Sequence, residues 1–550
     1  MDEFPIASGP RTTGDTIQHE LPRTRVLDLE EDRISRAKVD AALQENMSIK
    51  AALKKYPQAV IWSVLMTSAT LMESYDYGLM GNFFGLPAFQ KKYGDELPSG
   101  KFNVSAPTQT ELKQVTKAGQ IVGLLLAGYL CDRIGYRWTQ TLALALIVPI
   151  ILLQFMAPNV GALIAAQTLI GIPLGAFLTL SNVYASEVSP ICLRPYLTTY
   201  TQICWTVGGF ISTGILRGFV NNKTEWAYRI PFAVQWCWIP FIFVIMMGAP
   251  ESPVWCVKKG KLDRARAALR RLSSKHEPDD DMENRLAYMQ YTNEVELLEA
   301  RSVSYLECFR GTNLRRTEIA CAVYSIQPLC GFSLGNSSTY FLEQAGLNSA
   351  SAFDVGLGGS GLALVCIFIA WPLLKWYGRR TLLLIGLVII MISQIGIGAL
   401  GIPKPSSATA WATGGFCYLF TIPYNITVGP LSFLLITDMP TSRLRPKTAV
   451  LARSAYIGTT VFNVILTNYQ INATAWNWRG KSGFFWAGSC FLCLIWTYFR
   501  LPETRNRLAT ELDVMFEARI PARQFASTKV DAVSNGESYE SEEVYNVEKM

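Results

Sequence analysis

The sequence predicts an all-α, polytopic membrane protein in which twelve transmembrane helices form two six-helix pseudo-repeats. Half of the 550 residues are hydrophobic and 17% are charged, whereas a soluble chain usually carries about 25% charge. The hydrophobic residues also gather into segments of about 18–25 residues, which is long enough to cross the core of a bilayer. A large soluble α-helical protein is the alternative, but it needs all these segments to arise by accident.

The expected spans follow one another from residue 59 to residue 499. The second and fifth are the weakest, because Gly, Thr and Gln dilute their hydrophobic character. The spans are 59–84, 115–131, 138–157, 160–183, 199–219, 231–249, 318–340, 355–374, 381–402, 410–434, 447–468 and 483–499.

Polar segments divide the chain into five predicted parts. These are a cytosolic, disordered N-terminal segment (1–55), a first six-helix bundle (56–249), a cytosolic linker with short amphipathic helices (250–317), a second six-helix bundle (318–503) and a cytosolic tail (504–550). The N-terminal segment has the mixed charge of a soluble stretch and no signal peptide. The tail ends in an acidic sequence whose composition is typical of disorder.

Basic residues in the short loops predict the orientation. "CDRIGYRW", "KWYGRRT" and "SRLRPKT" are basic, whereas the loops near 157–160 and 341–354 lack Lys and Arg. The positive-inside rule then places both termini in the cytosol, and the plasma membrane is the expected location. Three glycosylation sequons, at Asn103, Asn222 and Asn472, fall in loops that this topology puts outside.

Several classes of activity are not predicted. The twelve Cys are spread mostly one to a helix and the two His lie in polar segments, so we expect no metal, disulfide or cofactor. No GxxxxGK[ST] loop occurs and no covalent chemistry is implied, so we expect no enzyme. The net charge of +7 lies largely in loops, so it bears on topology and does not suggest nucleic-acid binding.

Charged motifs repeat between the two halves. Glu187 and Arg194 are seven residues apart and precede a proline, as are Asp438 and Arg445 at an offset of 251 residues. "RIGYR" is matched by "WYGRR", and "PESP" by "PETR". Matched motifs in the same order predict parallel repeats with a substrate site between them, as in many transporters.

These motifs all lie at predicted cytosolic helix ends. An acid and an arginine there could pair and release as the cytosolic side opens, or the basic residues could simply set orientation. The gating candidates are Asp132, Arg133, Arg137, Glu187, Arg194, Glu251, Arg379, Arg380, Asp438, Arg445 and Glu503.

Two acids in the first span, Glu73 and Asp76, are the candidates for proton coupling. An ionised carboxylate at mid-membrane costs on the order of 3 kcal/mol, so such acids usually face a cavity or a partner. A spacing of three places them on one helical face. A purely structural pair is the alternative. Arg453 is the only deep cation expected, either as a charge partner for an acid in the other half or as a side chain that snorkels to the interface.

The motifs resemble those of the sugar porter family of the major facilitator superfamily over about residues 60–520. "GYLCDRIGYRW", "YASEVSP", "YRIPFAVQW", "PESPVW", "YGRR" and "PETR" carry this resemblance. A closer one, to fungal maltose-type α-glucoside permeases, rests on "GNFFGLPAFQKKYG", "LRPYLTTY", "EWAYRIPFAVQWCW", "TAWNWRGKSGFFWAG" and "ELDVMFEARIPARQF". It implies the major facilitator fold and proton symport of maltose and related α-glucosides, and it supports Glu73, Asp76 and Arg453 as coupling residues.

The chain departs from that subfamily's usual pattern at several places. It has "ESYD" for "EGYD", Gln120 where an acid is usual, Leu174 for Trp, and "QPLCGFS" in the seventh span.

A sugar site needs amides and hydroxyls for hydrogen bonds and aromatic rings for stacking. The candidates, at positions that commonly face the sugar in the family, are Gln202, Gln327, Ser333, Phe433 and Tyr456. Gln120 and Gln167 are further candidates, although either could instead join helices.

The sequence therefore predicts a monomeric transporter in the lipid bilayer that couples uptake of a small sugar, such as an α-glucoside, to protons by alternating access. An uncoupled facilitator, a polyol or other sugar-like substrate, and a non-transporting nutrient sensor are the alternatives. An anionic substrate would require a cation in the cavity.

Overall fold

The computed structural model describes residues 35–37, 39–40, 47–96, 100, 102–190, 193–274, 278–302, 305–336, 338–403, 406–441, 444–505, 509–525 and 527–528. Much of the N-terminal segment and the end of the acidic tail lie outside these ranges. The disorder expected for them therefore stays a prediction.

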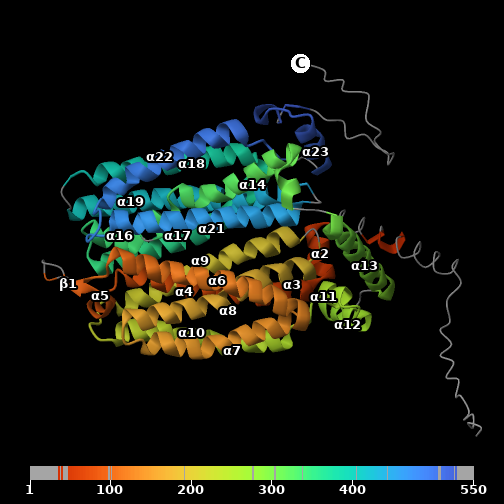
Figure 1. Ribbon diagram of the computed structural model, residues 1–550, viewed down its shortest axis with the longest axis horizontal. Coiled ribbons are helices and arrows are strands. Elements are labelled where there is room, and N and C mark those ends of the chain that lie inside the picture. Colours follow the sequence, from red (N-terminus) through yellow and green to blue (C-terminus); the bar gives the residue numbers. More distant parts are fainter. Residues whose placement is uncertain are drawn as a thin grey trace, which may run out of the picture.

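Long helices build the first half of the chain (Figure 1). They are α2 (Ile49–Lys55), α3 (Pro57–Thr67), α4 (Thr70–Phe83), α5 (Pro87–Tyr93), α6 (Ala106–Ile134), α7 (Tyr136–Met156), α8 (Val160–Val188), α9 (Arg194–Phe219) and α10 (Trp226–Gly248). Between α5 and α6, the two-residue strands β1 (Asp95–Glu96) and β2 (Phe102–Asn103) pair in antiparallel fashion.

Shorter helices connect the halves, and a second set of long helices follows. The connecting elements are α11 (Pro253–Lys258), α12 (Leu262–Leu272), α13 (Asp279–Ser302) and η1 (Tyr305–Phe309). The second half contains α14 (Gly311–Leu329), α15 (Phe332–Asn336), α16 (Ser338–Gln344), α17 (Ser349–Trp376), α18 (Arg379–Leu400), α19 (Ser407–Pro423), the π-helix η2 (Tyr424–Val428), α20 (Gly429–Asp438), α21 (Arg445–Ile471), η3 (Arg479–Lys481), α22 (Ser482–Arg500), α23 (Ala509–Glu517) and η4 (Ala522–Gln524).

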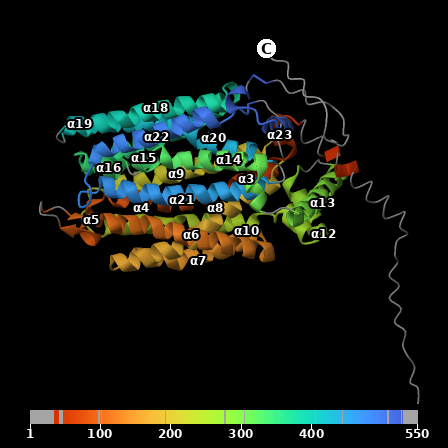
Figure 2. The ribbon, with the colours of Figure 1, turned by 45° about the horizontal axis from the view of Figure 1, so that its top comes forward.

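The two halves lie side by side with their long helices roughly parallel (Figures 1 and 2). Helix α9 packs against α17 and α6 packs against α21, so these pairs form the interface between the halves. One end of the molecule carries α11–α13, and the other carries α5 and β1 (Figure 1). We call these the α12 end and the β1 end.

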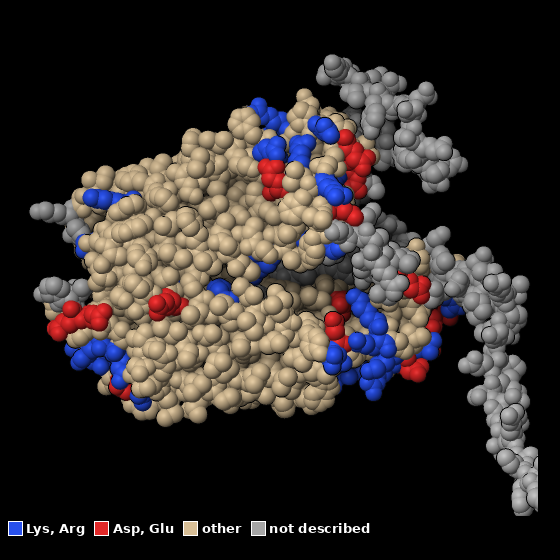
Figure 3. All heavy atoms as spheres, viewed as in Figure 1, with Lys and Arg blue, Asp and Glu red and all other residues tan. Residues whose placement is uncertain are grey.

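The surface is that of a membrane protein. Charged side chains gather mostly at the two ends of the long helices, with a largely uncharged band between them (Figure 3). Large hydrophobic side chains such as Leu125, Phe241, Val244 and Leu492 are exposed. Such a broad exposed apolar surface is typical of contact with lipid.

Eight helical segments in the described residues are long and apolar enough to span a membrane: Tyr136–Met156, Val160–Val188, Trp226–Gly248, Ser349–Ala370, Arg379–Leu400, Ser407–Ile436, Lys447–Ile471 and Arg479–Arg500. The other four predicted spans are also helical, as α3–α4, α6, α9 and α14. They are shorter or more polar, and α6, for instance, carries Lys113 and Lys117 in its first half.

Local sequence explains where two predicted spans break. The seventh, expected as one helix over 318–340, is divided into α14, α15 and α16. Pro328 lies at the end of α14, and Gly331 adopts φ +87°, a conformation that favours glycine. The first span is interrupted between α3 and α4, where Ser68 and Thr70 each donate a hydrogen bond to a backbone carbonyl three residues earlier. Discontinuous helices often form substrate sites in transporters.

Candidate transport site

Glu73 on α4 is fully buried and faces α6. Its Oε1 accepts a hydrogen bond from Gln120 Nε2 at 2.9 Å, and Gln120 Oε1 accepts one from Lys117 Nζ at 3.0 Å. The second carboxylate oxygen, Oε2, is buried and has no hydrogen-bond partner among the described residues. Glu73 therefore has one oxygen tied to the helix bundle and one available to a proton.

Asp76, one turn further along α4, is also buried but has different neighbours. Its Oδ1 accepts hydrogen bonds from Gln154 of α7 at 3.3 Å and from Gln235 of α10 at 3.2 Å. Its Oδ2 has no hydrogen-bond partner among the described residues. Although three residues apart, the two acids are thus served by separate polar groups.

Arg453 reaches the centre from the second half, on α21. Its guanidinium donates to the Tyr324 hydroxyl at 3.1 Å and lies 5.0 Å from the centre of the Tyr456 ring. The Phe433 ring meets Tyr324 edge-on at 5.6 Å. Arg453 forms no ion pair with a described acid, but it is close enough for its charge to act on Glu73. Its role as a charge partner stays a prediction.

A pocket between the halves contains one of the two acids and one sugar candidate, Asp76 and Ser333. The remaining lining residues come from α4, α6 and α21: Tyr77, Met80, Gly81, Leu112, Lys113, Thr116, Val464, Thr467 and Asn468. The pocket therefore combines hydroxyls, an amide and an aromatic ring, which are groups that a sugar site uses, but its volume of about 20 Å³ is too small for a sugar in this conformation.

The other sugar candidates are placed differently. Gln327 is buried, and its Nε2 has no hydrogen-bond partner among the described residues. Gln202 is half-buried on α9, one turn from Trp205. Gln167 accepts a hydrogen bond from Thr116 of α6 at 2.9 Å, which favours its alternative role of joining helices. None of these three lines the pocket around Asp76.

The structure corrects the expectation that Arg453 is the only deep cation. Lys113 and Lys117 of α6 also point inward: Lys113 lines the pocket, and Lys117 lies 4.8 Å from the centre of the Tyr77 ring. Their signal was the stretch "ELKQVTKAGQ", where lysines four residues apart share one helical face. Sequence reasoning also missed Tyr324, Gln154 and Gln235.

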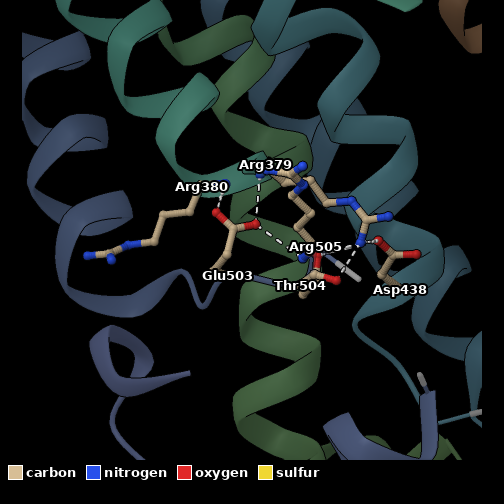
Figure 4. Close-up of polar contacts among 6 residues, drawn as sticks. All are labelled: Arg379, Arg380, Asp438, Glu503, Thr504 and Arg505. Atoms are coloured by element: carbon tan, nitrogen blue, oxygen red, sulfur yellow. Dashed lines mark hydrogen bonds and ion pairs between the residues drawn. The ribbon is translucent and has the colours of Figure 1, made fainter. Parts of the chain in front are cut away.

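At the α12 end of the second half, the Glu503 side chain caps the N-terminus of α18 (Figure 4). Its two oxygens accept hydrogen bonds from the backbone N–H groups of Arg379 at 2.7 Å and Arg380 at 3.1 Å. The Arg379 guanidinium forms an ion pair with Asp438 at 2.7 Å and donates to both oxygens of Thr504 at 2.8 Å. Each predicted gating residue in this cluster thus has a partner within the same half.

The first half has the matching arrangement at the start of α7. Glu251 accepts hydrogen bonds from the backbone N–H groups of Tyr136 at 2.9 Å and Ser252 at 3.2 Å. Burial raises the pKa of the Glu251 carboxyl, and the backbone N–H groups and the charge of Arg137 act in the opposite direction. Glu187 accepts hydrogen bonds from the Tyr136 hydroxyl at 2.8 Å and from the Ser252 hydroxyl.

The remaining gating candidates differ in what surrounds them. The side chains of Arg194 and Arg445 lie outside the described residues, so their expected pairing with Glu187 and Asp438 stays a prediction. Asp132 is exposed, and Arg133 is also exposed, with its guanidinium 4.6 Å from the centre of the Tyr129 ring. Arg380 donates to the Tyr498 carbonyl at 2.7 Å.

Hydrogen bonds join the two halves at the β1 end. Asn103 Nδ2 donates to Asn472 Oδ1 at 3.1 Å, and Asn472 Nδ2 donates to the Val104 carbonyl at 2.9 Å. Lys113 donates to Asn468 at 3.1 Å, and Arg217 forms an ion pair with Asp354 at 2.5 Å. Towards the α12 end, by contrast, the face in Figure 3 is hollowed between the halves.

These contacts involve two of the three glycosylation candidates, all of which stay predictions. Asn103 and Asn472 are buried, and their amide nitrogens, where a glycan would attach, are engaged in the bonds just described. Asn222 is half-buried, and its Oδ1 accepts from Thr224 at the surface. Among the described residues, no group of His, Cys, Asp or Glu could hold a metal ion.

Comparison with known proteins settles the family. The family model described as "Sugar (and other) transporter" matches residues 62–516. The chain belongs to the sugar transporter family. It is 38% identical to the maltose permease MAL61 of Saccharomyces cerevisiae over 512 residues, which cover 92% of this chain and 83% of that permease. It is 35% identical to the general alpha-glucoside permease of the same organism, with 90% and 81% covered.

The solved structure of the proton:xylose symporter XylE bound to 6-bromo-6-deoxy-D-glucose has the same fold. It superposes with a TM-score of 0.65 at 17% identity, covering 84% of this sugar transporter and all of that chain. XylE is a protein of the major facilitator superfamily. The predicted all-helical, polytopic fold of that superfamily is therefore confirmed.

Proposed function

We propose that this sugar transporter takes up an α-glucoside such as maltose together with protons, by alternating access. The observation that carries the coupling is the pair of buried acids, Glu73 and Asp76, each with one oxygen that lacks a hydrogen-bond partner among the described residues. A buried carboxylate is costly when charged and unpaired, so it readily takes up a proton when water reaches it. The similarity to maltose and alpha-glucoside permeases supports the substrate class.

The same geometry supports a direction of opening. We assign the α12 end to the cytosol, in agreement with the basic loops, so both termini are cytosolic and the plasma membrane is the expected location. Hydrogen bonds close the β1 end, while the surface is hollowed toward the α12 end (Figure 3). The conformation is then inward-facing, and a sugar would leave toward the cytosol.

Within this proposal, the sugar binds between the halves. Ser333 and Asp76 line the pocket, and Gln327, outside this pocket in the same broken seventh span, has an amide nitrogen without a hydrogen-bond partner among the described residues. The aromatic group of Tyr324, Phe433 and Tyr456 lies beside Arg453 on the second half. We also propose that the chain is a monomer in the bilayer and is organised into the five parts predicted from the sequence.

Uptake of labelled maltose, sucrose and trehalose in a cell without its own disaccharide carriers tests this function. We expect concentrative entry of at least one sugar, abolished by a protonophore. Lack of entry for all three would remove the α-glucoside assignment. Concentrative entry that survives the protonophore would remove proton coupling.

A second candidate, an acidic sugar-like substrate, is favoured by one observation. Lys113 lines the pocket together with Asp76, and the charges of Lys117 and Arg453 act on Glu73, so the centre contains three cations and two acids. Labelled gluconate, offered in the same cells, distinguishes the candidates. Gluconate uptake without entry of any disaccharide would favour the acidic substrate.

A further inference from the structure

Lys117 is placed between the sugar pocket and the proton-coupling acid. On one side its ammonium group lies 4.8 Å from the ring centre of Tyr77, a residue that lines the pocket, and 6.0 Å from that of Trp205. On the other side it donates a hydrogen bond to Gln120 at 3.0 Å, and Gln120 donates to Glu73 at 2.9 Å. A single lysine thus contacts both parts of the proposed mechanism.

Close packing of α6 fixes this arrangement. Gly119 and Gly123 of α6 meet the backbone of α8 so closely that a Cβ at either would collide with a carbonyl oxygen. Lys117 and Gln120 therefore project from a helix whose position is set by α8. The aromatic faces of Tyr77 and Trp205 hold the ammonium group through cation–π contacts.

The charges around Glu73 come from three elements. Lys117 of α6, Arg453 of α21 and Asp76 of α4 all act on it, and Tyr456 of α21 is near enough to interact. Arg453 is held by Tyr324, on the second half. Lys113, one turn from Lys117, is directed instead to Asn468 and to the face of Phe84. Lys117 is therefore the cation that the first half itself presents to Glu73.

We propose that Lys117 is a positioning residue for proton coupling, which holds Gln120 against Glu73 and favours the ionised carboxylate so that the proton leaves. This inference rests on the proposed function. When Glu73 carries the proton, Lys117 stays with Gln120 and the two aromatic rings. When the cavity is open to the cytosol, the ammonium charge stabilises the carboxylate and drives the proton off Oε2.

Lys117→Met and Lys117→Gln test the proposal, the second variant keeping a hydrogen-bond donor without the charge. Removal of a neighbouring positive charge lets a carboxyl group hold its proton at higher pH, by on the order of one pH unit. We expect the alkaline decline of maltose uptake to move about one pH unit upward in both variants. Lys117→Arg should restore the wild-type profile, and the exposed Lys92→Met is the matched control.

A purely structural role predicts a different result. With a structural role, substitution of Lys117 would lower the amount of protein that reaches the membrane, or the maximal uptake rate at every pH, without shifting the pH dependence of uptake. In a Glu73→Gln background, Lys117→Gln should produce no further shift, because the lysine acts through Glu73. If the wild type is proton-coupled and Lys117→Gln leaves the pH dependence of maltose uptake unchanged, the inference is overturned. Absence of proton-dependent uptake in the wild type overturns the proposed function instead.

Discussion

The α12 ends of the two halves share a backbone arrangement but differ in one neighbouring side-chain contact. In each half a glutamate after the sixth long helix, Glu251 or Glu503, accepts hydrogen bonds from the N–H groups at the start of α7 or α18. Beside it, the first half joins Glu187 to the Tyr136 hydroxyl, whereas the second half joins Asp438 to the Arg379 guanidinium. The repeat therefore conserves the helix cap while the adjoining link is a neutral donor in one half and an ion pair in the other.

A glycine in each half makes room for the cap. A Cβ at Gly135 or Gly378 would collide with the carboxylate of Glu251 or Glu503. Gly135 also adopts φ +93°, which favours glycine. The glycine that "RIGYR" and "WYGRR" share is thus explained by the approaching acid, whereas the residue after it, Tyr136 or Arg379, sets the charge of the link.

The largest expected effect comes from removing the caps. Glu251→Ala and Glu503→Ala each leave partly buried backbone N–H groups without a charged acceptor, and a hydrogen bond to a charged group contributes about 1.5–3 kcal/mol. We expect a clear loss of thermal stability in detergent for both variants and of comparable size. A loss confined to one half would show that the caps are not equivalent.

A smaller effect should separate the two links. Asp438→Asn leaves the Arg379 charge, which is about one-fifth exposed, without its ion pair, whereas Tyr136→Phe removes one hydroxyl and leaves Glu187 with Ser252. We expect the first to reduce stability more, with the excess diminishing at high salt because salt screens charge. Thermal unfolding at low and high salt measures this, and equal losses at both salt concentrations would contradict the comparison.

Replacing the residue that contacts Glu187 by the type that contacts Asp438 should give both halves an ion pair at this position. Tyr136→Arg places a guanidinium beside Glu187, as Arg379 is placed beside Asp438. If release of these contacts accompanies opening, the added ion pair should slow maltose uptake at unchanged expression, by a few-fold. The reverse exchange, Arg379→Tyr, should weaken the second half instead. If Tyr136→Arg takes up maltose at the wild-type rate, the contact between residue 136 and Glu187 has no part in gating.

The smallest effect is a pH dependence of the first half. Because burial raises the pKa of Glu251, the folded state holds its proton more tightly than the unfolded state. The penalty for burying the charge is present above the raised pKa and is relieved as pH falls through it toward the ordinary glutamate value of about 4.3. Melting temperatures between pH 7 and pH 5 should therefore show the wild type gaining stability relative to Glu251→Gln, with Lys92→Met as control. A pH-independent difference would contradict the assignment.

Periodicity and spacing predicted much of this architecture. The hydrophobic segments located the long helices, although α6 and α14 differ from their predicted spans by up to about ten residues at one end. The repeated motifs located the matching caps, because both signals are local in the chain. The breaks in the seventh span, between α14, α15 and α16, were missed, because a Pro and a Gly within a hydrophobic segment are compatible with either a kink or a stop.

The site was only partly predictable. Glu73, Asp76 and Arg453 stand out as charges in apolar surroundings, so composition alone marks them as candidates. Their partners do not stand out: Gln154 and Gln235 bind Asp76 from helices 78 and 159 residues away. The contact between Asn103 and Asn472 was not predictable for the same reason, since a pairing across 369 residues is invisible in a three-residue sequon.

The sequence by itself determined that this chain is a helical membrane protein with a twofold repeat and buried acids, because hydrophobicity, motif spacing and charge are properties of neighbouring residues. Only the tertiary structure decided which polar group faces which. It directed Lys117 toward Glu73 through Gln120, placed the Tyr136 hydroxyl against Glu187 in the first half, and buried Asn472 between the halves. Such pairings depend on how helices distant in the chain rotate and pack against each other, and backbone approaches such as that of α6 to α8 fix those rotations.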